Sequence, residues 1–239
     1  MNILVFGATG HMGQILCDQI EQSEDMTVCA RVGHCARIEY DGPVDCVIDF
    51  SHHDATGMLL EFCTARACPV VIATTGQTDG ERAGIQAAAR TIPVFFAANM
   101  SVGIALLAEL AERAARMFPG ADIEILERHH NRKLDVPSGT ALMLANRVAA
   151  VREGSELLVG RHENGRRRVQ EIGIHSLRYG NEVGTHEIIL SDGRETITLR
   201  HEAENRSLFA GGALAAARFL VGRPAGLYTM QSMLSGGNA

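Results

Sequence analysis

The first hundred residues alternate between short apolar runs and longer amphipathic segments. The apolar runs have the length of buried strands, and the segments between them repeat apolar residues three and four positions apart, as on one face of a helix. The expected strands are Asn2–Phe6, Thr27–Val32, Val44–Phe50, Pro69–Thr74 and Pro93–Ala97. The expected helices are Gln14–Glu21, His53–Ala67 and Asp79–Arg90. This alternation predicts an α/β fold with a doubly wound parallel sheet.

The pattern changes after Asn99, which is the best candidate for a domain boundary. Several strands then follow one another without helices between them, and this predicts an antiparallel or mixed sheet in an α+β domain. The expected strands are Asp122–Arg128, Glu171–Arg178, Thr185–Ser191 and Glu195–Ala203, with a short extended piece at Gly226–Met230. The expected helices are Val102–Phe118, Gly139–Val151 and Gly211–Val221, and the basic stretch Gly160–Arg168 is expected to be a mobile loop.

Composition argues against two classes of partner. The net charge is −6, aromatic residues make up 5% and Trp is absent, so the clustered cations and stacking side chains that nucleic acids require are scarce. No apolar run reaches the roughly 18 residues that span a bilayer, and the first residues lack the features of a secretory signal. We therefore expect a cytoplasmic protein with no nucleic-acid and no membrane partner.

The cysteines give no sign of a metal or redox site. All of them lie in the first third of the chain, none forms a Cys-X-X-Cys pair, and their spacing fits no zinc template. Free thiols are ordinary in a reducing compartment, so we expect no metal. The residues are Cys17, Cys29, Cys35, Cys46, Cys63 and Cys68.

A glycine-rich turn, Gly-Ala-Thr-Gly-His-Met-Gly at residues 7–13, connects the first strand to the first helix. Gly7 permits a tight turn, Gly10 lets the backbone approach a pyrophosphate, and Gly13 lets helix and strand pack closely. The free N–H groups at the helix start then face the phosphates. The motif is weak evidence alone, but its position at the first strand–helix turn of a parallel sheet indicates a dinucleotide site.

The end of the second strand bears on which dinucleotide is used. An acidic residue usually binds the NAD ribose there, but this chain has Arg31, with His34 and Arg37 close behind. Arginine can pair with a 2′-phosphate through its fork of donors, so we expect NADPH to be used at least as well as NADH. The alternative is that Arg31 is an ordinary solvated residue.

The segment between the expected strand at 122–128 and the helix at 139–151 carries the most chemistry. Two histidines, His129 and His130, precede Lys133, and a helix then begins at Ser138. Serine is a good N-cap, and the exposed N–H groups of the following two residues can bind a carboxylate. A histidine can deliver a proton near neutral pH. Together these residues indicate a site for a small acid that is protonated as it is reduced.

This segment resembles the signature of the dihydrodipicolinate reductase family of diaminopimelate and lysine biosynthesis. It reads His-His-X-X-Lys-X-Asp-X-Pro-Ser-Gly-Thr-Ala at residues 129–141. Similar matches run through most of the chain in the family's order, at 7–13, 49–51, 74–76, 98–101, 174–178, 183–187, 200–203 and 209–210.

The resemblance implies an enzyme that reduces 4-hydroxy-tetrahydrodipicolinate to tetrahydrodipicolinate with NADPH, NADH or both. It implies a Rossmann-type dinucleotide-binding domain of residues 1–100 and 208–239, and a substrate-binding and oligomerisation domain of residues 101–207 in a homotetramer. The implied proton donor is His129, assisted by Lys133. The implied contacts to the dicarboxylate substrate are His130, Lys133, Ser138, Gly139 and Thr140. The implied cofactor contacts, with Arg31 from the residue argument above, are Gly7, Ala8, Thr9, Gly10, His11, Met12, Ala73, Thr74, Thr75, Ala98, Asn99, Met100 and Ser101.

The chain departs from the family pattern at five points. Ala73 replaces the usual first glycine of its loop, Met100 replaces a phenylalanine, and Gly212 replaces an asparagine. The acidic residue after the second strand is absent, and the segment between the second and third strands is short. Changes at the first two positions affect cofactor affinity, and the missing acid favours NADP.

The residues by themselves leave two other readings open. One is a different nicotinamide enzyme on the same plan, such as an aspartate or a semialdehyde dehydrogenase. The semialdehyde enzymes need a nucleophilic cysteine in the second domain, and no cysteine follows Cys68. The other reading is a non-catalytic NAD(P) sensor, which would not need the site formed by His129, Lys133 and Thr140.

Overall fold

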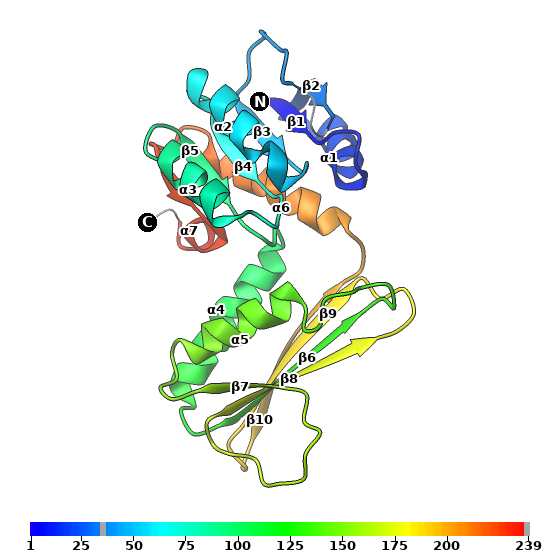
Figure 1. The fold of residues 1–239 in the computed structure, drawn as a ribbon, viewed down its shortest axis with the longest axis vertical. Helices are drawn as coiled ribbons and strands as arrows, with labels where there is room; N and C mark the ends of the chain where they lie inside the picture. Colours follow the sequence, from blue (N-terminus) through cyan, green and yellow to red (C-terminus); the bar gives the residue numbers. More distant parts are fainter. Residues whose placement is uncertain (34–36, 237–239) are drawn as a thin grey trace. The chain divides into compact units, whose positions relative to one another are not determined.

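The computed structural model describes residues 1–33 and 37–236, so His34 and Cys35 of the sequence argument lie outside the described residues. The chain divides into two compact units (Figure 1). Unit 1 comprises residues 1–102 and 206–239, and unit 2 comprises residues 103–205. No helix in the described part of the chain has the length and apolar character needed to cross a membrane.

Unit 1 is built on a parallel sheet of six strands, as the alternating pattern predicted. The strands lie in the order β11-β5-β4-β3-β1-β2, and every pair is parallel. Their bounds are β1 Asn2–Phe6, β2 Thr27–Val32, β3 Cys46–Asp49, β4 Val70–Ile72, β5 Pro93–Phe96 and β11 Gly226–Tyr228. The strand order reverses between β1 and β3, and open parallel sheets bind ligands at such a switch point.

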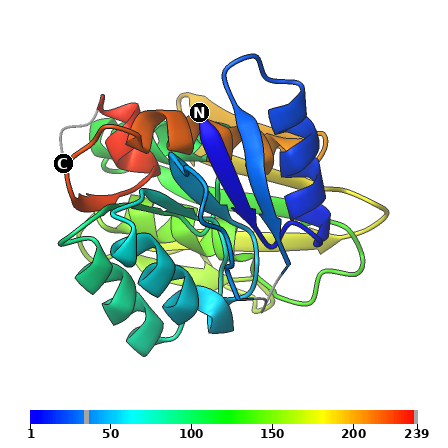
Figure 2. The ribbon, with the colours of Figure 1, turned by 90° about the horizontal axis from the view of Figure 1, so that it is seen from above.

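Helices cover both faces of this sheet (Figure 2). Helices α2 and α3 contact each other, and α1 contacts α6. Their bounds are α1 His11–Glu21, α2 Thr56–Ala65, α3 Asp79–Ala88, α6 Ser207–Leu220 and the short α7 Met230–Leu234, with a 3-10 turn at His53–Ala55. The apolar strand side chains and those of α2 and α3, such as Leu59 and Ile85, form one buried core. Helix α6 begins four residues before the expected start at Gly211.

Unit 2 contains a mixed sheet of five strands in the order β10-β9-β6-β8-β7. Strand β6 is central, parallel to β8 and antiparallel to β9. The bounds are β6 Asp122–His129, β7 Glu156–Val159, β8 Glu171–Arg178, β9 Gly184–Ser191 and β10 Thr196–Ala203. Two helices, α4 Val102–Met117 and α5 Gly139–Ala149, share an apolar core with the sheet. The sequence pattern did not predict β7, which pairs only with β8 in this sheet.

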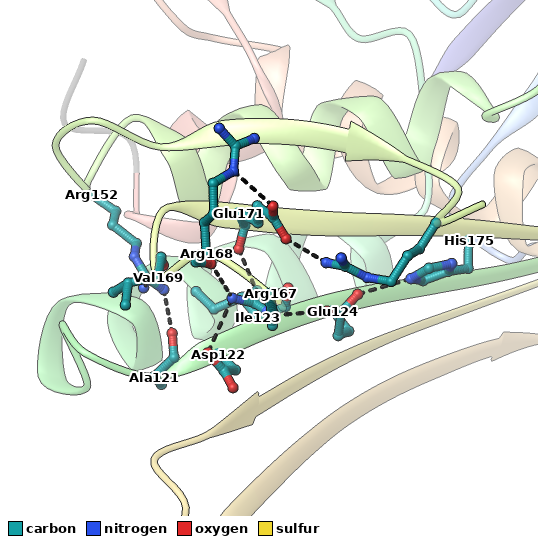
Figure 3. A network of polar contacts seen from close by, with 11 residues as sticks. Ala121, Asp122, Ile123, Glu124, Arg152, Arg167, Arg168, Val169, Glu171 and His175 are labelled. Carbon is teal, nitrogen blue, oxygen red and sulfur yellow. Dashed lines mark hydrogen bonds and ion pairs between the residues drawn. The ribbon is translucent and has the colours of Figure 1, made fainter. Parts of the chain in front are cut away.

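The basic stretch before β8 is bonded to the sheet of unit 2 (Figure 3). The Arg167 guanidinium donates to Asp122 Oδ1 at 3.0 Å and to Glu124 Oε1 at 3.1 Å. It also donates to the carbonyl oxygens of Ile123 and Glu171. Arg161 and Arg168 both pair with the Glu171 carboxylate. These cations are therefore neutralised within unit 2, and they stand apart from the histidine segment.

Candidate functional site

A buried carboxylate organises the histidine segment in unit 2. Side chains alternate across a strand, so Glu127 and His129 of β6 share a face with the buried Ile123 and Ile125. Glu127 is fully buried. Its carboxylate contacts Nδ1 of His129 and accepts hydrogen bonds from Arg178 Nη1 and Nη2 at 2.9 and 2.7 Å.

A third group also bonds this carboxylate. The backbone N–H of Ser138 donates to Glu127 Oε1 at 3.2 Å. Burial by itself raises the pKa of Glu127, but the hydrogen bonds from His129 and Arg178 outweigh it and hold the pKa well below the usual range. Glu127 is therefore an ionised carboxylate in the interior of unit 2.

The second ring nitrogen of His129, Nε2, faces Gly184 at the start of β9. A methyl group at Gly184 would lie 3.0 Å from Nε2 and 3.3 Å from Cδ2 of the ring. Glycine at this position therefore keeps the nitrogen uncovered. Nδ1 is held by Glu127, so Nε2 is the atom of His129 that is available for chemistry.

His186, a residue of β9, lies beside His129. The ring centroids are 5.2 Å apart, and the rings meet edge to face. His186 Nε2 is 3.2 Å from the Ser138 hydroxyl oxygen. Burial lowers the pKa of His186 to about 3, and the nearby charge on His129 contributes in the same direction. His186 is therefore neutral at physiological pH and acts as a structural neighbour of the site.

The loop at 130–137 carries Lys133, whose Nζ lies 2.8 Å from Asp135 Oδ1. Burial raises the pKa of Asp135, but its pairing with Lys133 has the larger combined effect and lowers it. Arg178 also donates to the Asp135 carbonyl oxygen at 2.7 Å. The Val136–Pro137 peptide bond at the end of the loop is cis. One arginine thus connects the buried Glu127 to the loop that carries Lys133.

Helix α5 begins where this loop ends. Ser138 is its N-cap, and the serine hydroxyl accepts the N–H of Ala141 at 3.2 Å. Gly139 is exposed, and a methyl group there would have no neighbour within 4 Å. The structure therefore places the start of α5 next to the buried pair, with the Gly139 N–H bonded to the Asp135 carboxylate. The backbone N–H of His130 donates to the Glu182 carbonyl oxygen, which fixes the strand end.

The glycine-rich turn of unit 1 has the tight geometry expected of it. Gly7 has a φ of +84°, and a side chain there would lie 2.6 Å from the Phe50 carbonyl group. A methyl group at Gly13 would lie 2.1 Å from the Gly7 carbonyl oxygen, so only glycine lets α1 approach β1 this closely. Gly10 caps α1 without a side-chain hydrogen bond, which leaves the helix start open to an anion.

The loop after β4 lies at the same edge of the sheet as the glycine turn. The Ala73 N–H bonds to the Asp49 carbonyl oxygen at 3.0 Å, and Thr74 is buried. The Asp49 carboxylate accepts the N–H and hydroxyl of Ser51, and burial raises the pKa of Asp49 despite these bonds. Thr75 is exposed at this edge. The expected cofactor contacts on this loop thus lie next to the end of β3, one of the two strands between which the strand order reverses.

The loop after β5 packs against α6. The Ser101 N–H bonds to Asn99 Oδ1 at 2.8 Å. A methyl group at Gly212 would lie 1.7 Å from the Met100 carbonyl oxygen. The departure from the family's asparagine at this position therefore has a local reason, because no side chain fits between α6 and the loop in this chain.

Arg31 pairs with an acidic residue of unit 1. Its guanidinium pairs with Glu21, the last residue of α1. A helix rises about 1.5 Å per residue, so Glu21 lies about 15 Å along α1 from the helix start where a pyrophosphate would bind. The pair uses Nη2 of Arg31, whose side chain is 52% exposed. Arg37 is exposed.

One group of side chains in the described ranges has the spacing of metal ligands. Ligand atoms of His52, His53 and Asp54 lie within 4.8 Å of one another. The Nδ1 atom of His53 also lies 3.1 Å from Glu81 Oε1, a residue of the capping box of α3. The histidine is therefore already bonded as part of the surface, and the expectation of no metal stays a prediction.

Sequence reasoning had assigned no role to Glu127, Arg178, Gly184 or His186. Glu127 stands two residues before His129, and strand alternation alone could have placed both on one face. The other three belong to β8 and β9 and lie within the family-like stretches 174–178 and 183–187, but no local pattern places them beside His129. Their contribution depends on the pairing of β6 with both neighbours.

Comparisons with known proteins cover nearly the whole chain and agree with the family resemblance of its sequence. The family model described as "Dihydrodipicolinate reductase, C-terminus" matches residues 103–234, and the N-terminal model matches residues 1–42 and 33–100. The chain is 40% identical over 250 residues to the 4-hydroxy-tetrahydrodipicolinate reductase of Caldanaerobacter subterraneus subsp. tengcongensis, with 99% of each chain covered. It is 42% identical over 242 residues to that of Akkermansia muciniphila, with 98% of each covered.

A solved structure extends the comparison to the fold. The dipicolinate-bound dihydrodipicolinate reductase from Paenisporosarcina sp. TG-14 superimposes with a TM-score of 0.80 at 24% identity, covering 96% of this chain and 97% of that one. The parallel sheet of unit 1 and the mixed sheet of unit 2 are thus those of a known two-domain fold. This chain therefore belongs to the dihydrodipicolinate reductase family, the 4-hydroxy-tetrahydrodipicolinate reductases of diaminopimelate and lysine biosynthesis.

Proposed function

We propose that this chain reduces 4-hydroxy-tetrahydrodipicolinate to tetrahydrodipicolinate, with loss of water, and that His129 donates the proton. The observation that carries this proposal is the state of the His129 ring. Nδ1 is engaged by the buried Glu127, and Nε2 faces the space that Gly184 leaves open. An acid held in this way can protonate a substrate as hydride arrives.

The dicarboxylate is proposed to bind between the start of α5 and the Lys133 loop. The N–H groups at Gly139 and Thr140 suit one carboxylate, and the Lys133 ammonium, with its side chain 24% exposed, supplies a point charge for the other. His130 and Ser138 border the same strand end and helix start. Negative charge that develops on the ring during reduction is stabilised by Lys133 and His129, so Lys133→Ala is expected to raise KM and lower kcat together.

Members of this family use NAD(P)H, and the residues of unit 1 suit such a group. The glycine turn is too tight for side chains at Gly7 and Gly13, and the start of α1 has no side-chain cap. Gly7 to Met12, Ala73 to Thr75 and Ala98 to Ser101 are proposed to hold the dinucleotide. When bound, the nicotinamide supplies the hydride. Arg31 is proposed to favour NADPH, and a kcat/KM tenfold lower with NADPH than with NADH would contradict this.

Loss of NADPH absorbance, followed with enzymatically generated 4-hydroxy-tetrahydrodipicolinate, tests the function directly. His129→Ala should lower kcat by about 10²–10⁴-fold, the usual contribution of a general acid, with little change in NADPH affinity. His162→Ala, which alters an exposed histidine of the same unit, serves as the control and should keep the wild-type kcat. A His129→Ala enzyme with near-full kcat would overturn the assignment.

The proposed assembly is a homotetramer formed through unit 2. Its support is the resemblance to the family, together with the two open edges of the five-stranded sheet at β10 and β7. Sedimentation equilibrium of the full chain measures the mass of the assembly, and a monomer at micromolar concentration would contradict the proposal.

A further inference from the structure

The Glu127 carboxylate lies behind His129 and touches no open surface. Three elements converge on it, and each contributes a donor. Arg178 comes from the end of β8, the Ser138 N–H from the start of α5, and His129 from β6 itself. A fully buried carboxylate is costly unless it is well paired, so this arrangement needs an explanation beyond the packing of the sheet.

We propose that Glu127 is a positioning residue for the reaction, which holds the His129 ring in the one orientation and tautomer that presents Nε2 to the substrate. This inference rests on the function proposed above. With Nδ1–H directed at the carboxylate, the proton that His129 delivers is carried by Nε2, on the side that Gly184 leaves open. Arg178 and Ser138 in turn hold the carboxylate in place.

The proton balance of the step is simple. Once the ring has lost water, a bound nicotinamide would supply hydride to the conjugated ring imine, and the Nε2–H bond of the His129 imidazolium would break to supply the proton. His129 is left neutral with its Nδ1 proton still bonded to Glu127, and water returns the proton to Nε2. Glu127 stays ionised throughout, in agreement with the donors around it.

The charged and titratable groups around the adjacent rings of His129 and His186 come from several elements. Glu127 belongs to the strand of His129, Arg178 to β8, His201 to β10 and Lys133 to the loop after β6. His186 is neutral, and Lys133 is paired with Asp135. Glu127 is therefore the one anion that pairs with the His129 ring among the described residues, and Glu127→Gln removes that charge.

The same carboxylate also bears on the lysine. Arg178 donates to Glu127 and to the Asp135 carbonyl oxygen, and the Asp135 side chain holds Lys133. Glu127 thereby supports both the proton donor and the loop that carries the cationic side chain. Replacing Glu127 should therefore lower kcat more than it changes the binding of NADPH to unit 1.

Glu127→Gln tests the proposal, because it keeps the shape and removes the charge. The donors around Glu127 now share two acceptor oxygens, whereas glutamine offers only one. Its amide N–H₂ group would face one of these donors and could not accept from it. We expect kcat to fall about 10²-fold, NADPH affinity to be unchanged, and the alkaline fall of kcat to move to lower pH. Glu127→Asp keeps the charge and should restore the position of that fall with only part of the kcat.

Glu112→Gln is a matched control. Glu112 of α4 bonds Arg116 of the same helix and joins α4 to α5 through its hydrogen bonds to Arg147, so its change also removes a carboxylate that bridges two elements of unit 2. Its kcat and pH profile should remain those of the wild type. A general loss of stability would affect both variants, whereas a positioning role affects only Glu127→Gln.

Nitrogen NMR of the His129 ring supplies a readout that needs no turnover. In the wild type the neutral ring should carry its proton on Nδ1, and in Glu127→Gln the Nε2–H form should become populated. A wild-type ring protonated on Nε2 when neutral, or a Glu127→Gln enzyme with wild-type kcat and pH profile, would overturn the inference. If Glu127→Gln does not fold, the kcat of Glu127→Asp and the tautomer of the wild-type His129 ring test the inference instead. A wild type without reductase activity would instead refute the proposed function, while the tautomer result would still judge the pairing.

Discussion

Replacing His186 with glutamine should remove a defined part of the acid sensitivity of the fold. His186 is 4% exposed, its Nε2 lies 3.2 Å from the Ser138 hydroxyl, and no hydrogen-bond partner reaches its Nδ1 within the described residues. A glutamine amide can reach the same hydroxyl and does not titrate. The substitution therefore changes the proton balance more than the packing.

The sign and size of the effect follow from the pKa. Burial lowers the pKa of His186 from its usual 6.5 to about 3, so below pH 6.5 the unfolded chain takes up a proton that the folded chain refuses. Stability is therefore lost as pH falls, until the folded protein also protonates near pH 3. Between pH 7 and pH 5 one such group costs about 2 kcal/mol of unfolding free energy.

Urea unfolding followed by circular dichroism near pH 7 and near pH 5 measures this loss. The wild type should lose about 2 kcal/mol more than His186→Gln over this interval. Most carboxyl groups titrate below this window, and His201, whose pKa burial also lowers, is present in both proteins. Equal losses in the two proteins would refute the claim that His186 is buried in its neutral form.

Two further predictions concern the site. Gly184→Ala would place a methyl carbon 3.0 Å from His129 Nε2, so steady-state assays should show kcat lowered about tenfold by displacement of the ring. The control is Gly120→Ala, where a methyl group has no neighbour within 4 Å, and it should have no effect. A Gly184→Ala enzyme with normal kcat would exclude Nε2 as the donor atom. Arg31→Ala should lower kcat/KM for NADPH and leave kcat/KM for NADH unchanged, because a 2′-phosphate would lose its partner. Equal changes with both cofactors would mean that the Arg31–Glu21 pair is only structural.

The local order of the chain was largely predictable from its sequence. The apolar runs from Asn2 onward are strands of a parallel sheet, and its central strands β1, β3 and β4 are buried. The change of pattern after Asn99 lies near the boundary between the units. Apolar periodicity and glycine placement are local signals, and they report directly on burial and on backbone freedom. Strand β7 was missed because its four residues carry no alternating pattern of their own, and its Leu157 and Val159 are 38% and 44% exposed.

The chemistry of the histidine segment divides in the same way. The sequence by itself determined that His129, Lys133 and the start of α5 lie close together, because they are neighbours along the chain. Only the tertiary structure decided how His129 is held. Arg178 is 51 residues from Glu127, and His186 is 48 residues from Ser138. These contacts exist only once β8 and β9 have paired with β6, since strand pairing and not sequence proximity brings the donors to the buried carboxylate.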